Sequence, residues 1–399
     1  MIALYFTNGR AATLALAFAL AFLSFPLRQV HASEETEPPR VRLGPWVGDL
    51  KVGPKMNAVG RHLKGSEFIG QDLRGAVFDG CDLEGAVFYQ CDLSNASFRD
   101  AWLTGMNITD CRVGRASFAG AIINGVVGMS GGLTDPRHNG WPHDMNLSPE
   151  QFMSTRSYKT KDLRKCVISF ETGQEAGPPK YDFRGAHLEG AYLRQGDCSQ
   201  CDFTDARIDG IDVVRCRIDF KQLASTHNFR NRRSLKGARF STVPFTGKWD
   251  LSGMDLSGTR EFPAFSFNND HINFADAVIT QCMFGGTITK TQLRSTRSFK
   301  EGDLRQITFY HIDFSEFDFS GVNLSGCKFL GCNFTGARFE DAVINDAQFT
   351  EHQPYPEKRI VPDFSGLTAP QIQSTWNYKH RRMAGIVLPK DIAAALLRE

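Results

Sequence analysis

Residues 61–125 read RHLKG SEFIG QDLRG AVFDG CDLEG AVFYQ CDLSN ASFRD AWLTG MNITD CRVGR ASFAG AIING. The third residue of each group is large and apolar in all thirteen groups, from Leu63 to Ile123. This period of five matches neither the 3.6 residues of a helical turn nor the two-residue period of an ordinary strand. It fits a chain that turns a corner every five residues, so that four groups form one turn of a square coil. Residues about 20 apart then stack at the strand spacing of about 4.8 Å.

The central residue of each group points into this coil, together with the mostly small residue two places before it. From Leu63 to Phe98 the central residues alternate between Leu and Phe, which places Phe on two opposite sides. Phe78, Phe98 and Phe118 are therefore expected to form one internal column. Burying each such side chain stabilises the fold by about 1.5–3 kcal/mol. Since each coil contacts mainly its neighbours, stability is close to a sum of local contributions.

The unit Cys81-Asp82-Leu83-Glu84-Gly85 resembles the repeat of the pentapeptide-repeat family. Units of this kind cover most of the chain that follows residue 60. The resemblance implies an all-β solenoid, a right-handed quadrilateral parallel β-helix. We expect short helical joints and a C-terminal capping helix in addition.

The repeat pattern divides into four arrays, at residues 61–127, 163–220, 235–286 and 304–350. The third array is irregular, because its pattern slips one place between Phe245 and Leu251 and is lost near Pro263. Bulges or a protruding loop are expected there. The remaining segments are expected to form an N-terminal extension and cap (33–60), a loop and joint (128–162), two joints (221–234 and 287–303), and a final joint and cap (351–399).

A second motif recurs at intervals of roughly 70 residues. It reads QFMSTRSYK at 151–159, QLASTHNFR at 222–230, QLRSTRSFK at 292–300 and QIQSTWNYK at 371–379. A helix-capping residue precedes each Gln by three places, which is the spacing of a capping box; these residues are Ser148, Asp219, Thr289 and Thr368.

We therefore expect each motif to form a short helix followed by an aromatic plug. Because the next array begins at a nearly constant distance after each Gln, the motif is expected to cover the open end of the array that follows, or to join two stacks. A ligand site formed by the repeated Ser-Thr pair is the alternative. At the C-terminus, residues 391–399 predict a closing helix capped by Asp391.

Residues 1–32 have the features of a cleaved secretory signal. Arg10 precedes an apolar run from 11 to 25, and Val30-His31-Ala32 is a small-residue cleavage pattern. An uncleaved membrane anchor is the alternative, but the run is shorter than the ~20 residues that a span needs. We expect export to the periplasm or cell exterior, with no membrane span in the mature chain.

The net charge of +2 comes from Arg10 and Arg28, so residues 33–399 carry 44 basic and 44 acidic residues (46 − 2 = 44). This neutrality argues against general attraction to nucleic acid or to anionic lipid. The family resemblance also brings in acidic members that mimic DNA and bind type II topoisomerases. The neutral charge and the export signal disfavour that function for this chain.

Ten cysteines in an exported protein would usually indicate disulfides. Here Cys198 falls on a large inward position, and the others fall on the small inward position: Cys81, Cys91, Cys111, Cys166, Cys201, Cys216, Cys282, Cys327 and Cys332. Free thiols that act as small apolar groups are therefore predicted. Cys91 and Cys111, which are 20 apart, are the one candidate bridge. The spacing Cys198-x-x-Cys201 is interpreted as a by-product of the repeat.

Candidate catalytic groups are few. Asp72 and Asp92 are expected to stack, as are Asp182 and Asp202, but an Asp or Asn before the central residue belongs to the repeat. A carbohydrate-active enzyme stays as an alternative, because other parallel β-helices carry lyase and hydrolase sites on stacked acids.

The most irregular loop holds two His and two Asp that could bind a metal: Asp135, His138, His143 and Asp144. Their spacing matches no specific metal-site template. We therefore predict no catalytic, cofactor-binding or metal-binding residue. The function predicted is that of an exported, non-catalytic scaffold or binding module, whose partner is a protein or a cell-surface polymer.

Overall fold

The computed structural model describes residues 46–47, 50–126, 129–130, 143–144, 147–170, 178–241, 248–259, 272–285, 288–350 and 366–397. The chain separates into two units, 1–40 and 41–399, and all the described residues belong to the second. The predicted signal at 1–32 lies outside them, as do Phe245, Pro263, Asp135 and His138. His143 and Asp144 are described as backbone only.

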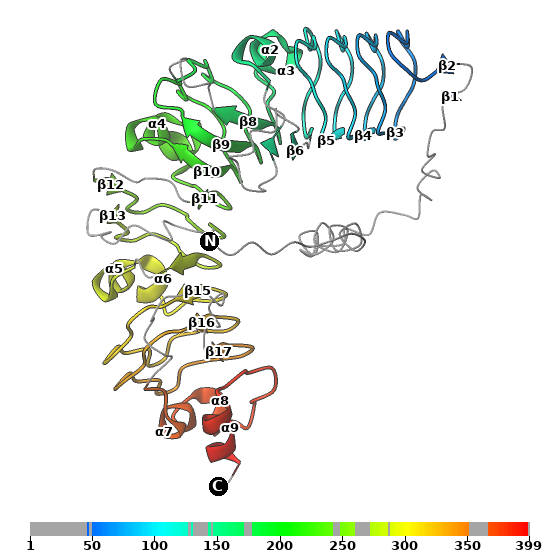
Figure 1. The fold of residues 1–399 in the computed structure, drawn as a ribbon. Helices are drawn as coiled ribbons and strands as arrows, with labels where there is room; N and C mark the ends of the chain where they lie inside the picture. Colours follow the sequence, from blue (N-terminus) through cyan, green and yellow to red (C-terminus); the bar gives the residue numbers. More distant parts are fainter. Residues whose placement is uncertain are drawn as a thin grey trace, which may run out of the picture. The chain divides into compact units, whose positions relative to one another are not determined.

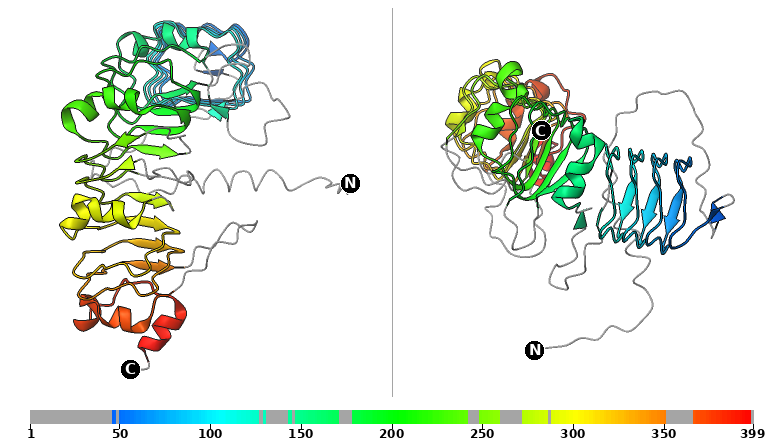
Figure 2. Two further views of the ribbon diagram at one scale, coloured as in Figure 1. Left: turned by 90° about the vertical axis from the view of Figure 1, so that its left-hand side faces the viewer. Right: turned by 90° about the horizontal axis from the view of Figure 1, so that it is seen from above.

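The first array is a four-sided coil with a register of 20 residues. Strands β3 (Glu67–Ile69), β4 (Val87–Tyr89) and β5 (Asn107–Thr109) pair in parallel, with Phe68 opposite Phe88 and Phe88 opposite Ile108. Single bridges connect the other three sides at the same spacing, for example Asp72 with Asp92. Seen along its axis, the array gives a four-sided outline (Figure 2, left). The predicted right-handed quadrilateral parallel β-helix is confirmed.

The same parallel pairing recurs in the later arrays (Figure 1). One sheet contains β8 (Val167–Phe170), β9 (Tyr192–Asp197), β10 (Asp212–Arg217) and β11 (Arg239–Ser241). Another contains β14 (Met283–Gly285), β15 (Thr308–Tyr310), β16 (Lys328–Leu330) and β17 (Gln348–Thr350). Within each array we call the side formed by these sheets, and by β3–β5, the strand side.

Three two-stranded pairs complete the described strands. β12 (Trp249–Asp250) and β13 (Ile272–Asn273) are parallel. Two pairs are antiparallel: β1 (Trp46–Val47) with β2 (Leu50–Lys51), and β6 (Met129–Ser130) with β7 (His143–Asp144).

Array 3 has the irregular register that its sequence predicts. Ser234 pairs with Asp255, and Asp255 pairs with Val278. The first of these coils has 21 residues (255 − 234) and the second has 23 (278 − 255), whereas a regular coil has 20. The extra place between Ser234 and Asp255 is the one-place slip of the sequence pattern. Stacking is therefore kept while the length of each coil changes.

Phenylalanine rings form the interior of array 1. Phe98 stacks on Phe78 with ring centroids 5.0 Å apart and on Phe118 at 5.2 Å, which confirms the predicted column. Phe68 and Phe88 stack at 4.6 Å on the opposite side. Rings of the two columns meet edge to face, as Phe78 and Phe88 do at 5.6 Å, so the columns together fill the coil.

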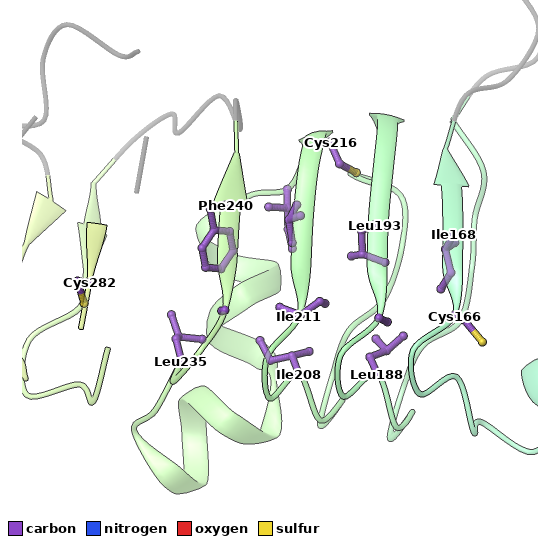
Figure 3. Packing of buried hydrophobic residues seen from close by; sticks show 14 of the residues in the cluster. Cys166, Ile168, Leu188, Leu193, Ile208, Ile211, Cys216, Leu235, Phe240 and Cys282 are labelled. Atoms are coloured by element: carbon purple, nitrogen blue, oxygen red, sulfur yellow. The ribbon is translucent and has the colours of Figure 1, made fainter. Parts of the chain in front are cut away.

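Array 2 fills the same interior mainly with aliphatic side chains (Figure 3). Ile168 and Leu193 lie on neighbouring strands of the strand side, and Phe240 on β11 continues the same sheet at the start of array 3. Leu188 and Ile208 stack on the adjacent side of the coil. The lattice thus accepts Leu, Ile or Phe at the central position, provided that the side chain fills the space.

Each joint motif forms two short helices, which lie on the side of the coil opposite the strand side (Figures 1 and 2). The helices are α2 (Pro149–Ser154) and α3 (Arg156–Lys159), α4 (Phe220–Ser225) and the π-helix η1 (Asn228–Arg232), α5 (Lys290–Ser295) and α6 (Arg297–Lys300), and α7 (Ala369–Gln373) and α8 (Trp376–Lys379). All four predicted capping boxes are present.

The last helix differs from its prediction. Helix α9 (Lys390–Leu396) begins one residue earlier than expected, with Pro389 as the N-cap residue and no side-chain cap. Asp391 lies inside the first turn, where its charge favours the helix dipole. The prediction that Asp391 caps this helix is therefore wrong. Among the helices of the described residues, none has the length and apolar character needed to cross a membrane.

We predict that Phe98→Ala lowers the free energy of unfolding by about 3–5 kcal/mol, because rings stacked above and below prevent collapse of the cavity. Denaturant titration followed by circular dichroism measures the change. Val59→Ser, a substitution of a side chain that is 55% exposed, serves as the control and should change stability little. A loss below about 1 kcal/mol for Phe98→Ala would contradict a packed column.

Candidate functional site

The joints bond to the array before them through the amide of the motif Gln. Gln371 Nε2 donates to the carbonyl oxygens of Phe334 (3.0 Å) and Ala337 (2.7 Å), and Gln151 Nε2 donates to that of Ala116. In a regular coil such a carbonyl accepts a backbone N–H from the next coil, as Ala96 O accepts from Ser117 N at 2.9 Å. The Gln side chain therefore replaces a backbone donor that the helix has removed.

A second replacement occurs six residues after each Gln. The Ser298 hydroxyl accepts the backbone N–H of Ile279 at 2.9 Å, and the Asn377 side chain accepts that of Ile344 at 2.7 Å. Ser157 and Asn228 accept from Ile123 and Ile208 in the same way. A side-chain oxygen thus takes the place of a carbonyl oxygen of the missing coil side.

The array that precedes each joint ends in a motif of its own, which the sequence reasoning missed. It is Phe-x-Gly/Asp-Ala-x-Ile, found at 118–123, 203–208, 274–279 and 339–344. The Gly or Asp donates its N–H to the motif Ser, as Asp276 N does to Ser295 O at 2.9 Å. Aligning the residues before each joint, as well as those after it, would have found this pattern.

The Thr of each Ser-Thr pair is buried and fully bonded. Thr296 donates its hydroxyl proton to Leu293 O at 2.7 Å and accepts the N–H of Phe299 at 3.1 Å. The other three joints repeat both bonds, at Thr155, Thr226 and Thr375. The Ser hydroxyl donates to the carbonyl of the motif Gln, as at Ser295. These bonds contradict the alternative in which the pair forms a ligand site.

Aromatic side chains attach the first three joints to the array that follows. The Phe299 ring lies 5.4 Å from Phe317, Tyr158 lies 6.2 Å from Tyr181, and Phe220 lies 5.3 Å from Trp249. Tyr181, Trp249 and Phe317 each occupy the inward position that is small elsewhere in the repeat. Polar groups therefore bond each joint to the preceding array, and in the first three joints rings pack it on the next array.

The second joint contains one residue more than the first and third. Leu235 lies thirteen residues after Gln222, where the corresponding spacing elsewhere is twelve. The extra residue is taken up by the π-helix η1, a wider turn with i→i+5 bonds. Its basic cluster is engaged locally, since Arg230 pairs with Asp205 at 3.2 Å and Arg232 with Asp209 at 3.3 Å.

All ten cysteines are buried free thiols. Those at the small inward position commonly donate to a carbonyl of the preceding coil, as Cys81 does to Ala58 O at 2.8 Å and Cys327 to Leu304 O at 2.9 Å. Burial raises the pKa of Cys282 and of Cys327 to about 12. The prediction of free thiols serving as small apolar groups is confirmed.

The candidate bridge between Cys91 and Cys111 is not formed, since both are free thiols. Cys111 Sγ accepts the backbone N–H of Cys91 at 3.3 Å, while Cys91 Sγ donates to Phe68 O in the opposite direction along the stack. The two thiols still interact, since a hydrogen bond between their side chains raises the pKa of Cys111. Cys198 and Cys201 likewise bond to different groups, the carbonyls of Arg217 and Pro179.

The stacked acids have the structural role that the repeat predicts. Asp72 Oδ1 accepts the N–H of Arg74 at 3.2 Å, and Asp202 Oδ1 accepts that of Thr204 at 2.9 Å, which are Asx turns at the corners. Asp72 also pairs with the Arg74 guanidinium at 2.6 Å, and this hydrogen bond lowers the pKa of Asp72 to about 2.

Arginines neutralise the acidic stacks in place. Arg184 lies 2.9 Å from Asp182 and 3.9 Å from Asp202, and its hydrogen bond holds the pKa of Asp182 well below the usual range. The sequence Asp-Leu/Phe-Arg gives such a pair at 72–74, 162–164, 182–184 and 303–305. Within the part of the chain that the structure describes, no cluster of three or more His, Cys, Asp or Glu side chains is arranged to hold a metal ion.

The strand side carries two rows of residues that the sequence reasoning did not single out. They directly follow the central residue and stack one coil apart, as Ile69, Tyr89 and Thr109 in array 1 and as Tyr310, Leu330 and Thr350 in array 4. Ile69 is 37% exposed and Tyr89 is 38% exposed. We call these two rows the outer ladder. Reading the printed sequence at intervals of 20 would have revealed both rows.

The fold and its surface define a non-globular class of protein, a parallel β-solenoid assembled from repeats. The family model for pentapeptide repeats matches eight copies, at residues 62–100, 72–110, 182–218 and 318–351. The chain therefore belongs to the pentapeptide-repeat proteins. No curated protein sequence matches it.

Two solved structures illustrate the resemblance. HetL, a pentapeptide-repeat protein involved in heterocyst differentiation regulation in the cyanobacterium Nostoc sp. strain PCC 7120, is 17% identical, with 77% of this chain and 92% of HetL covered at a TM-score of 0.15. A trypsin-treated variant of QnrB1, a plasmid-mediated fluoroquinolone resistance protein, is 15% identical, with 85% and 96% covered at a TM-score of 0.16. TM-scores this low carry no information about the function of this chain.

We predict that Gln371→Glu destabilises the C-terminal joint by about 1–3 kcal/mol. The carboxylate still accepts the N–H of Thr368, but it cannot donate to the carbonyls of Phe334 and Ala337. Denaturant titration measures the loss, and Gln90→Glu, the same change at an exposed residue, serves as the isosteric control. Equal stability of both variants would show that the amide donor is not needed.

We predict that stability is constant above about pH 5 and falls between about pH 4 and pH 2. The pKa values of these aspartates are lower in the folded state, so their contribution is present above the unfolded value of 3.8 and is lost as pH falls through the folded values; they include Asp72, Asp162, Asp182 and Asp303. Thermal unfolding at a series of pH values measures this dependence. Asp72→Asn, which keeps the turn acceptor but removes the charge, should weaken the dependence on pH, and an unchanged midpoint at pH 2.5 would contradict the prediction.

Proposed function

We propose that this protein is an exported, non-catalytic solenoid that serves as a structural scaffold or as a binding module for a protein or a surface polymer. The outer ladder on the strand side is the observation that carries the proposal. The composition of residues 1–32 and the neutral charge of residues 33–399 support export.

The outer ladder differs from the neighbouring sides of array 1. Next to it, Lys64 pairs with Glu84 at 2.9 Å, and Asp72 pairs with Arg74. Such charged pairs are solvated and contribute little binding energy. Ile69 and Tyr89 instead leave aliphatic and aromatic surface in contact with water. An extended partner lying along the coil axis would bury both, and the Tyr hydroxyl could bond to it.

The absence of catalysis is supported by how the acids are used. A general acid needs a pKa near the working pH, whereas Asp72 is held at a pKa of about 2 by Arg74. The rival function is that of a carbohydrate-active β-helix. Turnover of any member of a panel of acidic polysaccharides by the purified chain would establish it.

Mimicry of DNA is the second rival and requires a surface dense in uncompensated acid. The pairing of acids with arginines two residues later, as in Asp162 with Arg164 and Asp303 with Arg305, argues against such a surface. Cell fractionation tests the same point from location. Recovery of the chain from the cytoplasm alone would contradict the export proposal and favour DNA mimicry.

We predict that the double variant Ile69→Ser/Tyr89→Ser loses most of the partner that the unaltered chain captures from its own cell envelope, measured as bound protein and bound glycan. Val59→Ser is the matched control, since Val59 is 55% exposed and follows Ala58 on the opposite side of the same array. The control should capture the partner as well as the unaltered chain. Equal capture by the double variant would exclude the outer ladder as the binding surface.

A further inference from the structure

One pair of thiols converges to direct contact. Cys216 Sγ lies 3.3 Å from Cys198 Sγ, and both side chains are fully buried. All ten cysteines lie in the described part of the chain, and most of the other thiols bond to backbone groups or, at Cys282, also to the Thr259 hydroxyl. The pair therefore brings two sulfur atoms into contact inside the core of array 2.

The stacked thiols of Cys91 and Cys111 are the natural comparison. They also influence each other, since the interaction with Cys91 raises the pKa of Cys111. However, the Cys91 thiol donates to Phe68 O, away from Cys111, and Cys111 Sγ accepts the backbone N–H of Cys91. The Cys198 thiol also donates to a carbonyl, that of Arg217 at 2.9 Å, whereas the thiol of Cys216 donates to the sulfur of Cys198.

The contact arises where strands β9 and β10 run past a corner of the coil. Both strands are six residues long and include the corner residues Gln195 (φ 47°) and Arg215 (φ 50°), whose left-handed conformation recurs at other corners, as at Gln90 and Asp110. Cys216 pairs in register with Gly196, so Cys198 lies two places beyond its register partner. The two cysteines are therefore 18 residues apart, whereas residues that stack in register are 20 apart. Cys198 occupies a large inward position and Cys216 a small one. Their side chains converge for this reason.

We propose that Cys198 and Cys216 form a disulfide bond when the chain folds in an oxidising compartment. The sulfur atoms must approach from 3.3 Å to a bond length of about 2.05 Å. The thiolate of one cysteine attacks a small-molecule or protein disulfide, and the second cysteine then displaces the leaving thiol. One S–S bond forms and one breaks, the two cysteines lose two protons and two electrons, and the oxidant is reduced to two thiols.

Burial determines when this exchange occurs. Neither sulfur is accessible in the closed coil, so the bond forms before the coils of array 2 close over it. Once formed, it resists reduction for the same reason.

The bond would fix the part of array 2 on which the second joint rests. The carbonyl of Cys198 accepts the Gln222 amide at 2.8 Å, and the N–H of Cys198 donates to Arg217 O at 3.1 Å. A cross-link between Cys198 and Cys216 therefore ties together the last two coils before helix α4. It would stabilise the joint that contains the π-helix η1.

Refolding tests the proposal without reference to cellular location. The chain is unfolded in reductant, refolded with reduced and oxidised glutathione, alkylated in denaturant, and digested without reduction. We expect one cross-linked peptide pair containing Cys198 and Cys216, with a mass about 2 Da below that of the two thiol peptides. Cys198→Ser should abolish this species, and the matched control Cys91→Ser should leave it unchanged.

Alkylation of both Cys198 and Cys216 in the refolded chain would overturn the proposal, as would a dominant bridge between any other pair. A chain that does not refold can be produced directly in the oxidising periplasm of a bacterial host and mapped in the same way, with the same two outcomes. Because the readout is the bond itself, a cytoplasmic location of the natural protein would defeat the export proposal and leave this test valid.

Discussion

Every part of this structure depends on the stacking of one coil on the next. The backbone N–H and C=O groups of a coil find their partners in the neighbouring coil, as Phe98 N does with Ser117 O at 2.8 Å. A buried backbone group without a partner is costly, so a coil cannot be interrupted unless its neighbours are satisfied in another way. The interior follows the same rule, because rings at the same side of successive coils stack on each other.

The joints are the solution to this constraint. Each removes one side of a coil and restores the lost hydrogen bonds with side chains, the Gln amide as donor and a Ser or Asn oxygen as acceptor. The basic residue at the end of the motif pairs with an Asp of the preceding array in three joints, for example Lys300 with Asp276 at 2.7 Å. In the first joint Gly120 stands where that Asp would be, and Arg156 lies 3.8 Å from Asp100. The polar side chains of the joints therefore hold neighbouring coils together.

Part of the outer surface of the coils takes no part in holding them together. Asp and Asn side chains are engaged in corner turns, thiols in bonds to carbonyls, and arginines in local ion pairs. In the outer ladder, Ile69 and Tyr89 leave aliphatic and aromatic surface exposed on the strand side. A solenoid whose internal groups are satisfied in this way is suited to presenting a regular face to an extended partner.

The coil, its regular register, the Phe columns and the capped helices of the joints could all be predicted from the sequence. These features depend on spacing along the chain: every fifth residue points inward, and a capping Ser, Thr or Asp lies three places before its Gln. Spacing also explains why most cysteines serve as small buried groups, since Cys alternates with Ala at one inward position.

Which groups meet across coils became visible only in the folded chain. Cys91 and Cys111 share the spacing of a stack, yet the Cys91 thiol bonds to Phe68 O, whereas the thiol of Cys216 meets the sulfur of Cys198 on the neighbouring coil. The joint's bonds to the preceding array were also hidden, because loops of different length separate the two partners in the sequence. Spacing fixes the direction of a side chain within its own coil. Contact with the next coil depends on which side chains stand at neighbouring inward positions of the two coils, and these positions are far apart in the sequence.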